Sequence, residues 1–335
     1  MLLFYSNTNQ LYLHMKICIL KVDNNISNSA ISKFEPSANP INWLKEHEYE
    51  QWSLSANNSK DLLNQLLKND FEVYVNLCDG AKGEDRPGIE VVNILEKADV
   101  AFTGANSKFY EPTRFEMKNA CIEANINYPK GVIVEKNYNV GTLLNILQFP
   151  MIVKHFNSYN SIGMTIKSVV NNVSELTIQA SKMILEFGSA MIEEYIDGIE
   201  FTALVVENSI NKNEPIVFEP MQIVFPEGEK FKHFDLKWKN HISMKYIPVI
   251  DKNISDRIKN MSAGMFKTMN GCGYARCDLR MNNNGELFIL EINPNCSIYF
   301  PKEDPSSADE ILFAENNGHE LFTKLILKSA FNRCR

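Results

Sequence analysis

Residues 275–293 read ARCDLRMNNNGELFILEIN, and this stretch decides the fold that we expect. Two apolar segments flank an Asn-Gly turn, which is typical of a β-hairpin. A hairpin brings Asp278 on the first strand beside the far end of the second strand. Glu291 and Asn293 are two positions apart on that second strand, so period-2 geometry points both side chains to one face. The stretch therefore predicts three converging oxygen ligands.

These oxygen ligands predict a magnesium site. Mg²⁺ prefers hard oxygen ligands and keeps positions for water and phosphate oxygens when it serves a nucleotide. An ordinary hairpin with solvated polar residues is the alternative. Against that alternative, Glu291 lies among Ile289, Leu290 and Ile292 in a strongly apolar strand, where a carboxylate needs a partner.

Two further segments favour a phosphate or nucleotide ligand. Lys154 ends the apolar strand Met151–Lys154 and precedes a polar, glycine-containing loop over 157–163, so its charge and the loop's N–H groups can bind a phosphate. Lysines that end strands are commonplace, however. Glu193 and Glu200 lie near the junction of two strands and can accept hydrogen bonds from an adenine amino group or a ribose hydroxyl. A solvated acidic turn is the alternative for these glutamates.

The first third of the chain predicts an α/β unit. Lys16–Val22 has the pattern of a buried strand, 58–67 that of an amphipathic helix and 72–77 that of the next strand, which together make one βαβ step of a parallel sheet. The glycine-rich segment 79–88 follows at the carboxyl edge of that sheet, where open α/β sheets bind ligands. A simple turn rich in turn-forming residues is the alternative.

A second unit is expected to begin near residue 111. Thr113 and Glu116 form the pattern of a capping box, which predicts a helix that continues through Cys121. Further along we expect strands at Gly131–Glu135 and Met151–Lys154, a helix over 176–187 and a strand-dominated region from Met191 onward. We therefore divide the chain into an extension (1–15), an N-terminal α/β domain (16–110), a central lid (111–190) and a C-terminal subdomain (191–335).

Composition limits the classes of function. The 335 residues carry a net charge of -7 and a pI of about 5.5, which argues against a nucleic-acid-binding surface and favours a small anionic ligand. Seven cysteines without a C-x-x-C pair indicate reduced thiols and a cytoplasmic location. The first 15 residues do not resemble a signal peptide, and no stretch approaches the roughly 20 apolar residues of a membrane-spanning helix. We expect neither nucleic acid nor a membrane as a partner.

Five motifs in order over 76–295 resemble the ATP-grasp superfamily, and within it the D-alanine:D-alanine ligase-like branch. The first is the segment with Asp79-Gly80, Gly83-Glu84-Asp85 and, further on, Phe102-Thr103-Gly104. The others are the two lysines Lys118 and Lys154, the loop Asn160-Ser161-Ile162-Gly163-Met164, the hinge with Glu193, Ile196 and Glu200 before Phe201-Thr202, and the set Arg276, Asp278, Glu291 and Asn293.

The resemblance implies a fold and a set of site residues. The fold is an α/β ATP-grasp architecture, in which an open parallel α/β domain precedes a two-part domain that grips ATP. The implied cofactors are ATP and Mg²⁺ or Mn²⁺, with two ions. The implied roles are phosphate binding by Lys118 and Lys154, adenine and ribose binding by Glu193, Ile196 and Glu200, metal binding by Asp278, Glu291 and Asn293, and catalysis by Arg276, Lys237 and Ser161.

The implied reaction joins a small-molecule carboxylate to an amine through an acyl-phosphate. Charge stabilisation carries most of such catalysis, so metals and cationic side chains matter more than a general base. A nucleotide-binding sensor or scaffold without ligase activity is one alternative, and a phosphotransferase is another. The chain could form a homodimer.

The substrate half of the family pattern is altered here. Where the D-alanine ligases carry a Gly-Gly-x-Ser segment with an acidic residue for the substrate's amino group, residues 23–27 read DNNIS. The family's closing triad of glutamate, serine and tyrosine aligns with Ser158, Asn160 and Trp238, which cannot form the same hydrogen-bond chain. Cys296-Ser297 replaces the proline-glycine after the metal-binding asparagine. We therefore expect a substrate other than D-alanine, although Asp79, Glu84 or Asp85 could supply the acidic group and leave a D-alanine:D-alanine ligase as the alternative.

Overall fold

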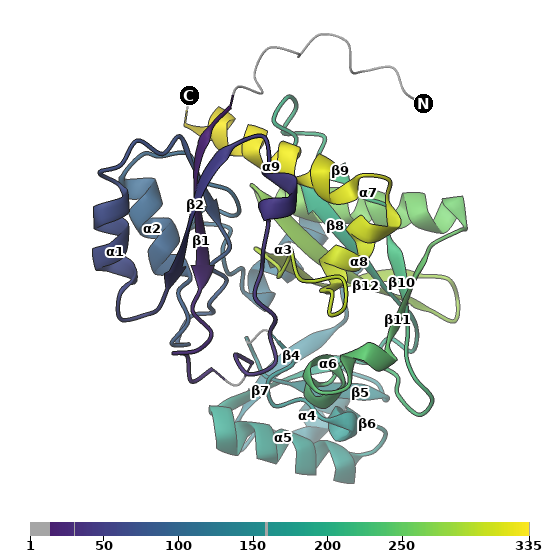
Figure 1. The fold of residues 1–335 in the computed structure, drawn as a ribbon. Coiled ribbons are helices and arrows are strands. Elements are labelled where there is room, and N and C mark those ends of the chain that lie inside the picture. The colour runs from purple at the N-terminus through teal and green to yellow at the C-terminus, as the bar shows by residue number, and fades with distance from the viewer. Residues whose placement is uncertain (1–13, 30, 158–159, 335) are drawn as a thin grey trace.

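The computed structural model describes residues 14–29, 31–157 and 160–334. Three β-sheets follow one another along this part of the chain, with helices packed on their faces (Figure 1). The α/β class that the sequence predicts is confirmed. Residues 1–13 of the expected extension lie outside the described residues, and Met15 is already buried in the same cluster as Ile17.

The first sheet is parallel and has helices on both faces (Figure 1). It contains β1 (Lys16–Val22), β2 (Glu48–Leu54) and β3 (Val73–Asn76) in the order β2-β1-β3. Cys18 and Leu20 pack against α1 (Ser59–Leu66) and α2 (Ile89–Lys97), whereas Ile17 and Ile19 pack against α9 (Gly318–Arg333). The last helix of the chain therefore completes its first sheet.

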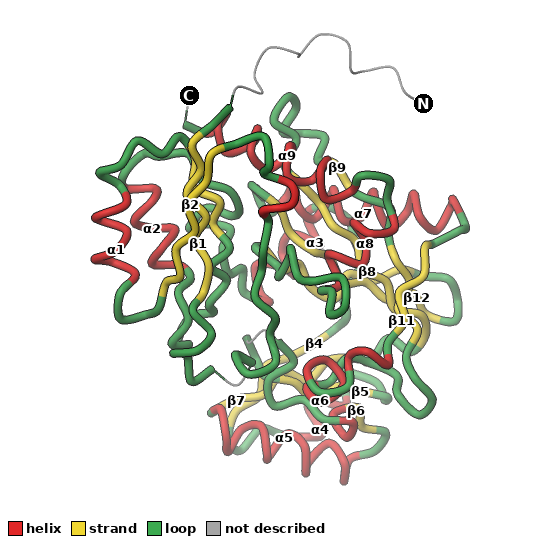
Figure 2. Tube along the Cα trace, in the orientation of Figure 1, coloured by secondary structure: helices red, strands yellow, loops and turns green. Residues whose placement is uncertain are grey.

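The predicted strand and helix of this unit are confirmed, but β2 was not predicted. It lies at the edge of the sheet, and residues 48–51 are exposed. An edge strand that contacts water does not need alternating apolar side chains, so it gives no periodic signal. The segment between β1 and β2 is almost entirely loop, with one short 3₁₀ turn, η1 (Ile41–Trp43) (Figure 2). The Asn39 N–H donates to the Tyr299 carbonyl at 2.8 Å, which ties this loop to a distant part of the chain.

The second sheet is a four-stranded antiparallel sheet in the order β4-β7-β5-β6. Its strands are β4 (Gly131–Glu135), β5 (Met151–Lys154), β6 (Val169–Val170) and β7 (Ser189–Glu194). The helices α4 (Val140–Leu144) and α5 (Val173–Phe187) share its core. The helix α5 ends at Gly188, whose φ of 84° is left-handed and favours glycine.

The third sheet holds the predicted hairpin. The strands β8 (Gly198–Val206), β10 (Met221–Val224), β11 (Lys245–Pro248), β12 (Tyr274–Asn282) and β13 (Leu287–Pro294) are in the order β11-β10-β8-β12-β13, and β9 (Ile216–Val217) pairs with β8. One face packs against α3 (Arg114–Glu123) and α7 (Lys252–Thr268), and another cluster joins the sheet to α8 (Ser307–Ala314) and α9. The expectation of a strand-dominated C-terminal region is wrong, because α7 and α9 are among its longest elements.

Two elements do not fit the domains that we expected to meet at 110 and 190. The helix α3 packs with α7 and β13 in the core of the third sheet rather than with the second sheet. The strand β7 runs from 189 to 194 and is the strand that β4 and β5 both pair with. The ranges therefore stay a proposal about domains. No described helix is long and apolar enough to cross a membrane.

The capping box of α3 gives a test of this local structure. Thr113 accepts from the Glu116 N–H, and Glu116 accepts from the Thr113 N–H at 2.7 Å, as the sequence predicts. Replacing Thr113 by Ala should lower the free energy of unfolding by about 1 kcal/mol, because it leaves N–H groups at the helix start without an acceptor. Urea unfolding measures this loss. Thr113→Ser keeps the hydroxyl and should keep wild-type stability, so an equal loss in both variants would contradict the cap.

Candidate active site

An irregularity in the hairpin determines which side chains face the site. Asp278 pairs with Glu291 and Leu279 pairs with Ile289, so Leu290 is the one residue of β13 between them that has no partner. Ile289 and Ile292 are both completely buried in the core. Strict alternation from Ile289 would have put Glu291 in that core. The β-bulge instead turns Glu291 to the face that carries Asp278.

The three expected metal ligands lie together. The Asn293 amide nitrogen is 3.2 Å from a Glu291 carboxylate oxygen and 3.4 Å from one of Asp278. If the Asn293 side-chain amide is rotated by 180°, its oxygen takes the place of its nitrogen beside Glu291 and Asp278. That orientation would let the oxygen bind a cation held by the two carboxylates. The described residues contain no group of three His, Cys, Asp or Glu side chains that could hold a metal. Two carboxylates and one amide nevertheless fit Mg²⁺ that is completed by phosphate oxygens.

Arg276 and Thr202 hold Asp278 in place. The Arg276 guanidinium donates to both Asp278 oxygens, at 3.0 and 2.7 Å, and the Thr202 hydroxyl donates at 2.9 Å. Burial raises the pKa of Asp278, but Arg276 and Lys232 outweigh it and hold that pKa below its usual value. Asp278 therefore stays ionised and can bind a cation.

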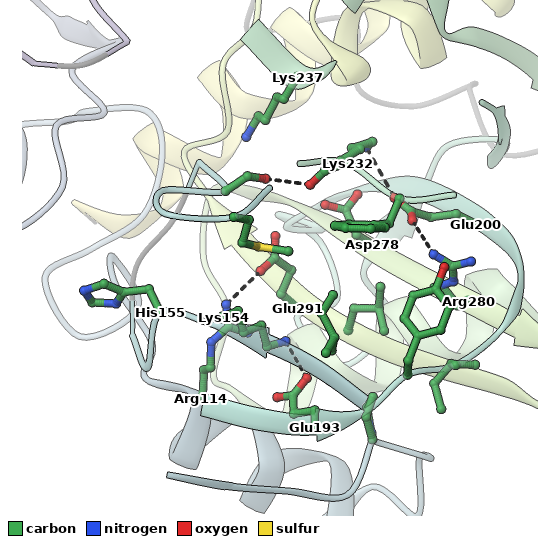
Figure 3. A pocket seen from close by; sticks show the side chains of 18 of the residues that line it. Arg114, Lys154, His155, Glu193, Glu200, Lys232, Lys237, Asp278, Arg280 and Glu291 are labelled. Atoms are coloured by element: carbon green, nitrogen blue, oxygen red, sulfur yellow. Dashed lines mark hydrogen bonds and ion pairs between the residues drawn. The ribbon is translucent and has the colours of Figure 1, made fainter. Parts of the chain in front are cut away.

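A cavity of about 110 Å³ lies between the second and third sheets (Figure 3). It is lined by nine of the eleven residues that the sequence analysis selected: Ser161, Lys154, Glu193, Ile196, Glu200, Lys237, Arg276, Asp278 and Glu291. Asn293 lines the adjoining cavity. The structure thus brings together residues from both sheets and from two loops.

Lys154 and Glu193 form a buried ion pair on the wall made by the second sheet (Figure 3). Burial, with the charge of Arg114, lowers the pKa of Lys154, and Glu193 opposes that change. The second Glu193 carboxylate oxygen, Oε1, is buried without a hydrogen-bond partner among the described residues. A buried acceptor of this kind needs a donor, and a ligand N–H in the cavity would provide one.

The opposite wall is held by Glu200 and Arg280. Arg280 donates to Glu200 at 3.2 Å and to the carbonyls of Lys230 and Gly198 at 2.9 and 2.8 Å, and its guanidinium lies 4.8 Å from the centre of the Tyr195 ring. Burial raises the pKa of Glu200, and Lys232 and Arg280 counteract it. Sequence analysis missed Arg280, although it is two residues beyond Asp278 on the same strand and therefore on the same face.

The structure places Lys118 away from the cavity. Lys118 is exposed, whereas Arg114, the first residue of α3, is buried, lines the cavity and lies 3.5 Å from Glu291. The stripe of α3 that packs in the core contains Met117, Ala120 and Cys121, and Lys118 lies just outside it. The α3 cation that reaches the site is therefore Arg114.

Two loops from different sheets meet over the cavity. The Lys237 ammonium and the Trp238 indole N–H both donate to Asn160, each at 3.1 Å, and the Ser161 hydroxyl donates to the Lys232 carbonyl at 2.9 Å. Lys237 and Trp238 belong to the short helix α6 (Phe234–Trp238). Ser158, the third position of the altered triad, lies outside the described residues. Asn160 and Trp238 thus form a contact that differs from the family's hydroxyl-to-carboxylate chain.

Lys232 is a site residue that the sequence did not reveal. It lines the cavity, its ammonium nitrogen is 3.9 Å from Glu200, and that nitrogen is buried without a hydrogen-bond partner among the described residues. Burial lowers its pKa, but the Tyr246, Asp278 and Glu200 side chains outweigh burial and raise it. Burial also lowers the pKa of Lys237, together with Arg276, to about 8. No motif marks Lys232, because it occupies an irregular loop.

A second cavity of about 140 Å³ adjoins the first. Asn160, Lys232, Lys237 and Arg276 line both cavities, so three cations stand where the two cavities meet. On its far side the second cavity reaches Asp79 and Ser297. These two residues also line a small pocket of about 30 Å³ at the carboxyl edge of the first sheet.

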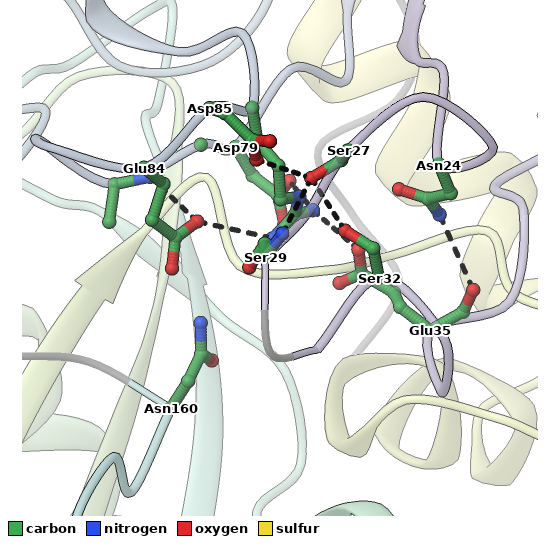
Figure 4. Close-up of polar contacts among 12 residues, drawn as sticks. Asn24, Ser27, Ser29, Ser32, Glu35, Asp79, Glu84, Asp85 and Asn160 are labelled. Carbon is green, nitrogen blue, oxygen red and sulfur yellow. Dashed lines mark hydrogen bonds and ion pairs between the residues drawn. The ribbon is translucent and has the colours of Figure 1, made fainter.

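Three acidic side chains, Glu35, Asp79 and Glu84, lie at this edge (Figure 4), and all three are close to Arg86. Arg86 contacts Glu35 and donates to Asp79 at 2.5 Å, and Glu84 lies 3.7 Å from it. The Ser297 hydroxyl lies 3.2 Å from Glu35 and 3.4 Å from Asp79. Burial raises the pKa of Glu35 to about 8, Asp79 adds to this rise, and Arg86 opposes it. One guanidinium therefore faces three carboxyl groups.

Asp85 and Glu35 correct our expectation about the loop after β1. Asp85 accepts from the Ser27 hydroxyl at 2.6 Å and from the Asn28 N–H at 2.5 Å, so it holds this loop instead of lining the cavity (Figure 4). Glu35 comes from the same loop, outside residues 23–27 where we looked for an acidic side chain. Glu35 lies further from β1 in the sequence than residues 23–27, and it reaches the site only because the loop folds back.

Comparison with known proteins fits this geometry. Residues 129–298, just over half of the chain, match the family described as "D-ala D-ala ligase C-terminus". A D-alanine–D-alanine ligase of Halothermothrix orenii is 25% identical over 238 residues, which span 68% of this chain and 66% of that protein. The ligase of Mannheimia succiniciproducens is 24% identical over 273 residues, with 79% and 81% covered. The chain thus spans slightly less than two thirds of the first of these relatives.

Solved structures share the fold. The D-alanine–D-alanine ligase of Bacillus anthracis complexed with ATP gives a TM-score of 0.68 at 16% identity, over 96% of this chain and 98% of that one. The VanG D-Ala:D-Ser ligase of Enterococcus faecalis gives 0.68 at 16% identity, over 94% and 100%. With the family match over 129–298, the chain belongs to the D-alanine:D-alanine ligase-like branch of the ATP-grasp superfamily.

Proposed function

We propose that this protein is an ADP-forming ligase that joins a carboxylate to an amine through an acyl-phosphate. The observation that carries the proposal is the position of Lys232, Lys237 and Arg276 at the junction of the two cavities. A phosphoryl group that passes from a nucleotide in one cavity to a carboxylate in the other must cross this junction. Three cations there stabilise the charge that develops during the transfer.

The first cavity suits ATP. The free oxygen of Glu193 is placed to accept from an adenine amino group, Ile196 offers an apolar contact to the base, and Glu200 is placed for ribose hydroxyls. Lys154 and Arg114 provide positive charge for the phosphates, and Ser161 belongs to the loop that covers them. Lys118 has no part in this proposal because it lies outside the cavity.

Asp278, Glu291 and Asn293 would hold Mg²⁺ or Mn²⁺. When bound, these ions would neutralise phosphate charge and polarise the transferred group. The chain's own contribution is positioning: Arg276 and Thr202 hold Asp278, and Arg114 holds Glu291. The bulge at Leu290 keeps both carboxylates on one face.

In the proposed reaction, an oxygen of the substrate carboxylate attacks the γ-phosphorus of ATP, and the bond to the ADP oxygen breaks. The amine nitrogen then attacks the acyl carbon, phosphate leaves and the amine loses a proton. Arg276 and Lys237 orient the carboxylate and offset the charge on the transferred oxygens. Neither step needs a side chain as nucleophile.

The acidic cluster supports an amino acid as the carboxylate substrate. Glu35 and Asp79 each approach Ser297, and with Glu84 they place three carboxyl groups around the one guanidinium of Arg86. An ammonium group bound there would pair with these carboxyl groups and favour the ionised form of Glu35. The substrate would then lie with its carboxylate at the cations and its ammonium at Glu35 and Asp79.

We retain a substrate other than D-alanine as a proposal, now on different grounds. Glu35 supplies the acidic group that the sequence appeared to lack, so that reason no longer supports the proposal. The support that is left is the contact of Asn160 with Trp238, which replaces the family's closing triad. We also propose that the enzyme is cytoplasmic and acts on small molecules. Light scattering would show whether it forms a homodimer.

The reaction predicts a trappable intermediate. With ATP, Mg²⁺ and a carboxylate substrate, hydroxylamine should give a hydroxamate together with ADP, because it attacks an acyl-phosphate in place of the amine. A sensor or scaffold would give no ADP. A phosphotransferase would give ADP and a phosphorylated product without hydroxamate. A D-alanine:D-alanine ligase would convert D-alanine to the dipeptide, which mass spectrometry detects.

Removing the charge of Glu291 should weaken metal binding. In Glu291→Gln, the affinity for Mn²⁺ in the presence of ADP should fall at least about tenfold, because a neutral amide is a weaker ligand for a divalent cation than a carboxylate. Electron paramagnetic resonance of free Mn²⁺ measures this change without turnover. Glu286→Gln is the control, since Glu286 is exposed at the turn of the same hairpin. Equal Mn²⁺ affinity in the wild type and Glu291→Gln would remove Glu291 from the metal site.

Glu35 should make stability depend on pH. Its pKa is raised from 4.5 to about 8 in the folded protein, so between these values the folded state binds more protons than the unfolded state. The free energy of unfolding should therefore fall from pH 5 to pH 8 through this group. Glu35→Gln resembles the protonated form and should become progressively more stable than the wild type over that range. Parallel urea-unfolding profiles for the two proteins would contradict the raised pKa.

A further inference from the structure

The second cavity has an apolar wall that the proposed reaction does not use. Phe34 from the loop after β1, Met244 next to β11, Tyr246 on β11 and Phe300 after β13 all line it. Met244 and Phe300 are each 8% exposed, so they belong to the interior of the protein and not to its surface. The cavity of about 140 Å³ is larger than the nucleotide cavity of about 110 Å³.

Hydrogen bonds and packing fix this wall. Asp309 accepts from the N–H groups of Tyr299 and Phe300 at 2.8 and 3.1 Å, which sets the loop that carries Phe300. The Tyr246 hydroxyl lies 2.8 Å from the Ser307 hydroxyl. Met244 packs in a cluster with Leu236. Met244, Tyr246 and Phe300 are therefore held in place before any substrate binds, which favours selectivity for the side chain.

The size of the cavity exceeds what a small amino acid fills. At roughly 10–15 Å³ for each water, the cavity holds on the order of ten water-sized groups. An amino acid bound with its carboxylate at Arg276 and its ammonium at Asp79 has only its side chain left for the apolar wall. Alanine offers one methyl group there. A longer side chain buries more apolar surface and gains binding free energy in proportion.

We infer that the amino acid that supplies the carboxylate carries a large apolar or aromatic side chain, which packs against Phe34, Met244 and Phe300. This inference rests on the proposed ligase reaction and names its substrate class. Leucine, methionine and phenylalanine are the probes of that class. The polar groups at the two ends of the cavity bind the parts that all α-amino acids share, and the wall selects among the side chains.

The test uses the full chain with ATP, Mg²⁺ and hydroxylamine, so that the donor is identified without the natural amine. Alanine, leucine, methionine and phenylalanine, each as the D and L form, are supplied singly. For at least one large apolar amino acid, kcat/KM for hydroxamate formation should exceed that for alanine of the same hand by about tenfold or more.

Matched variants assign the selectivity to the wall. Phe34 and Phe313 are the same residue type and are both 37% exposed, but only Phe34 lines the cavity. Phe34→Ala should lower kcat/KM for the preferred large substrate about tenfold and leave the KM for ATP unchanged. Phe313→Ala should leave both values unchanged. Urea unfolding of each variant separates a loss of fold from a loss of selectivity.

The outcomes distinguish this inference from the function on which it rests. If alanine forms hydroxamate at least as fast as every large apolar amino acid, the inference about the side chain is wrong. The proposed ligase reaction would still hold. Equal losses in Phe34→Ala and Phe313→Ala remove the wall as the cause of selectivity. ATP binding with no hydroxamate from any amino acid overturns both the amino-acid ligase and the inference.

Discussion

Within a few residues, strand β13 places side chains both in a hydrophobic core and in a charged cavity. Ile289 and Ile292 must both enter the core, and Glu291 between them must stay out of it. A regular strand cannot satisfy the three demands, because its side chains alternate strictly. The unpaired Leu290 shifts the phase by one residue and resolves the conflict. The position of Glu291 opposite Asp278, and with it the pairing to Arg114 and the proposed metal site, depends on this shift.

The charges that line the two adjoining cavities come from all three parts of the chain and are mostly paired before any ligand is present. Ion pairs at this depth add little net stability, since desolvation of each charge offsets their attraction. Their effect is to fix side chains such as Asp278 in one orientation, as a preorganised electrostatic site needs. Glu193 Oε1 and Lys232 Nζ are among the buried atoms that have no hydrogen-bond partner in the described part of the chain, and both residues line the first cavity, where a ligand could supply the missing partners.

Sequence periodicity and capping chemistry were sufficient for the hairpin, the first βαβ step and the start of α3, because these are local patterns. They could not predict the edge strand β2, which lacks apolar alternation. Nor could they distinguish Arg114 from Lys118, since the choice depends on which face of α3 meets the third sheet. Glu35 and Lys232 escaped for another reason: both lie on irregular loops whose path is set by tertiary contacts, and no spacing rule extends to such loops.

The packing of α9 on β1 and β3 has a consequence for biosynthesis. The ribosome synthesises β1 well before α9, so the face of the first sheet with Ile17 and Val73 has no cover until residues 318–333 have been made. During that interval the nascent chain presents an apolar strand surface of the kind that promotes aggregation. Completion of the first unit is thereby delayed until the other two have been synthesised, and a chaperone that shields exposed apolar surface would act on this face of the nascent chain.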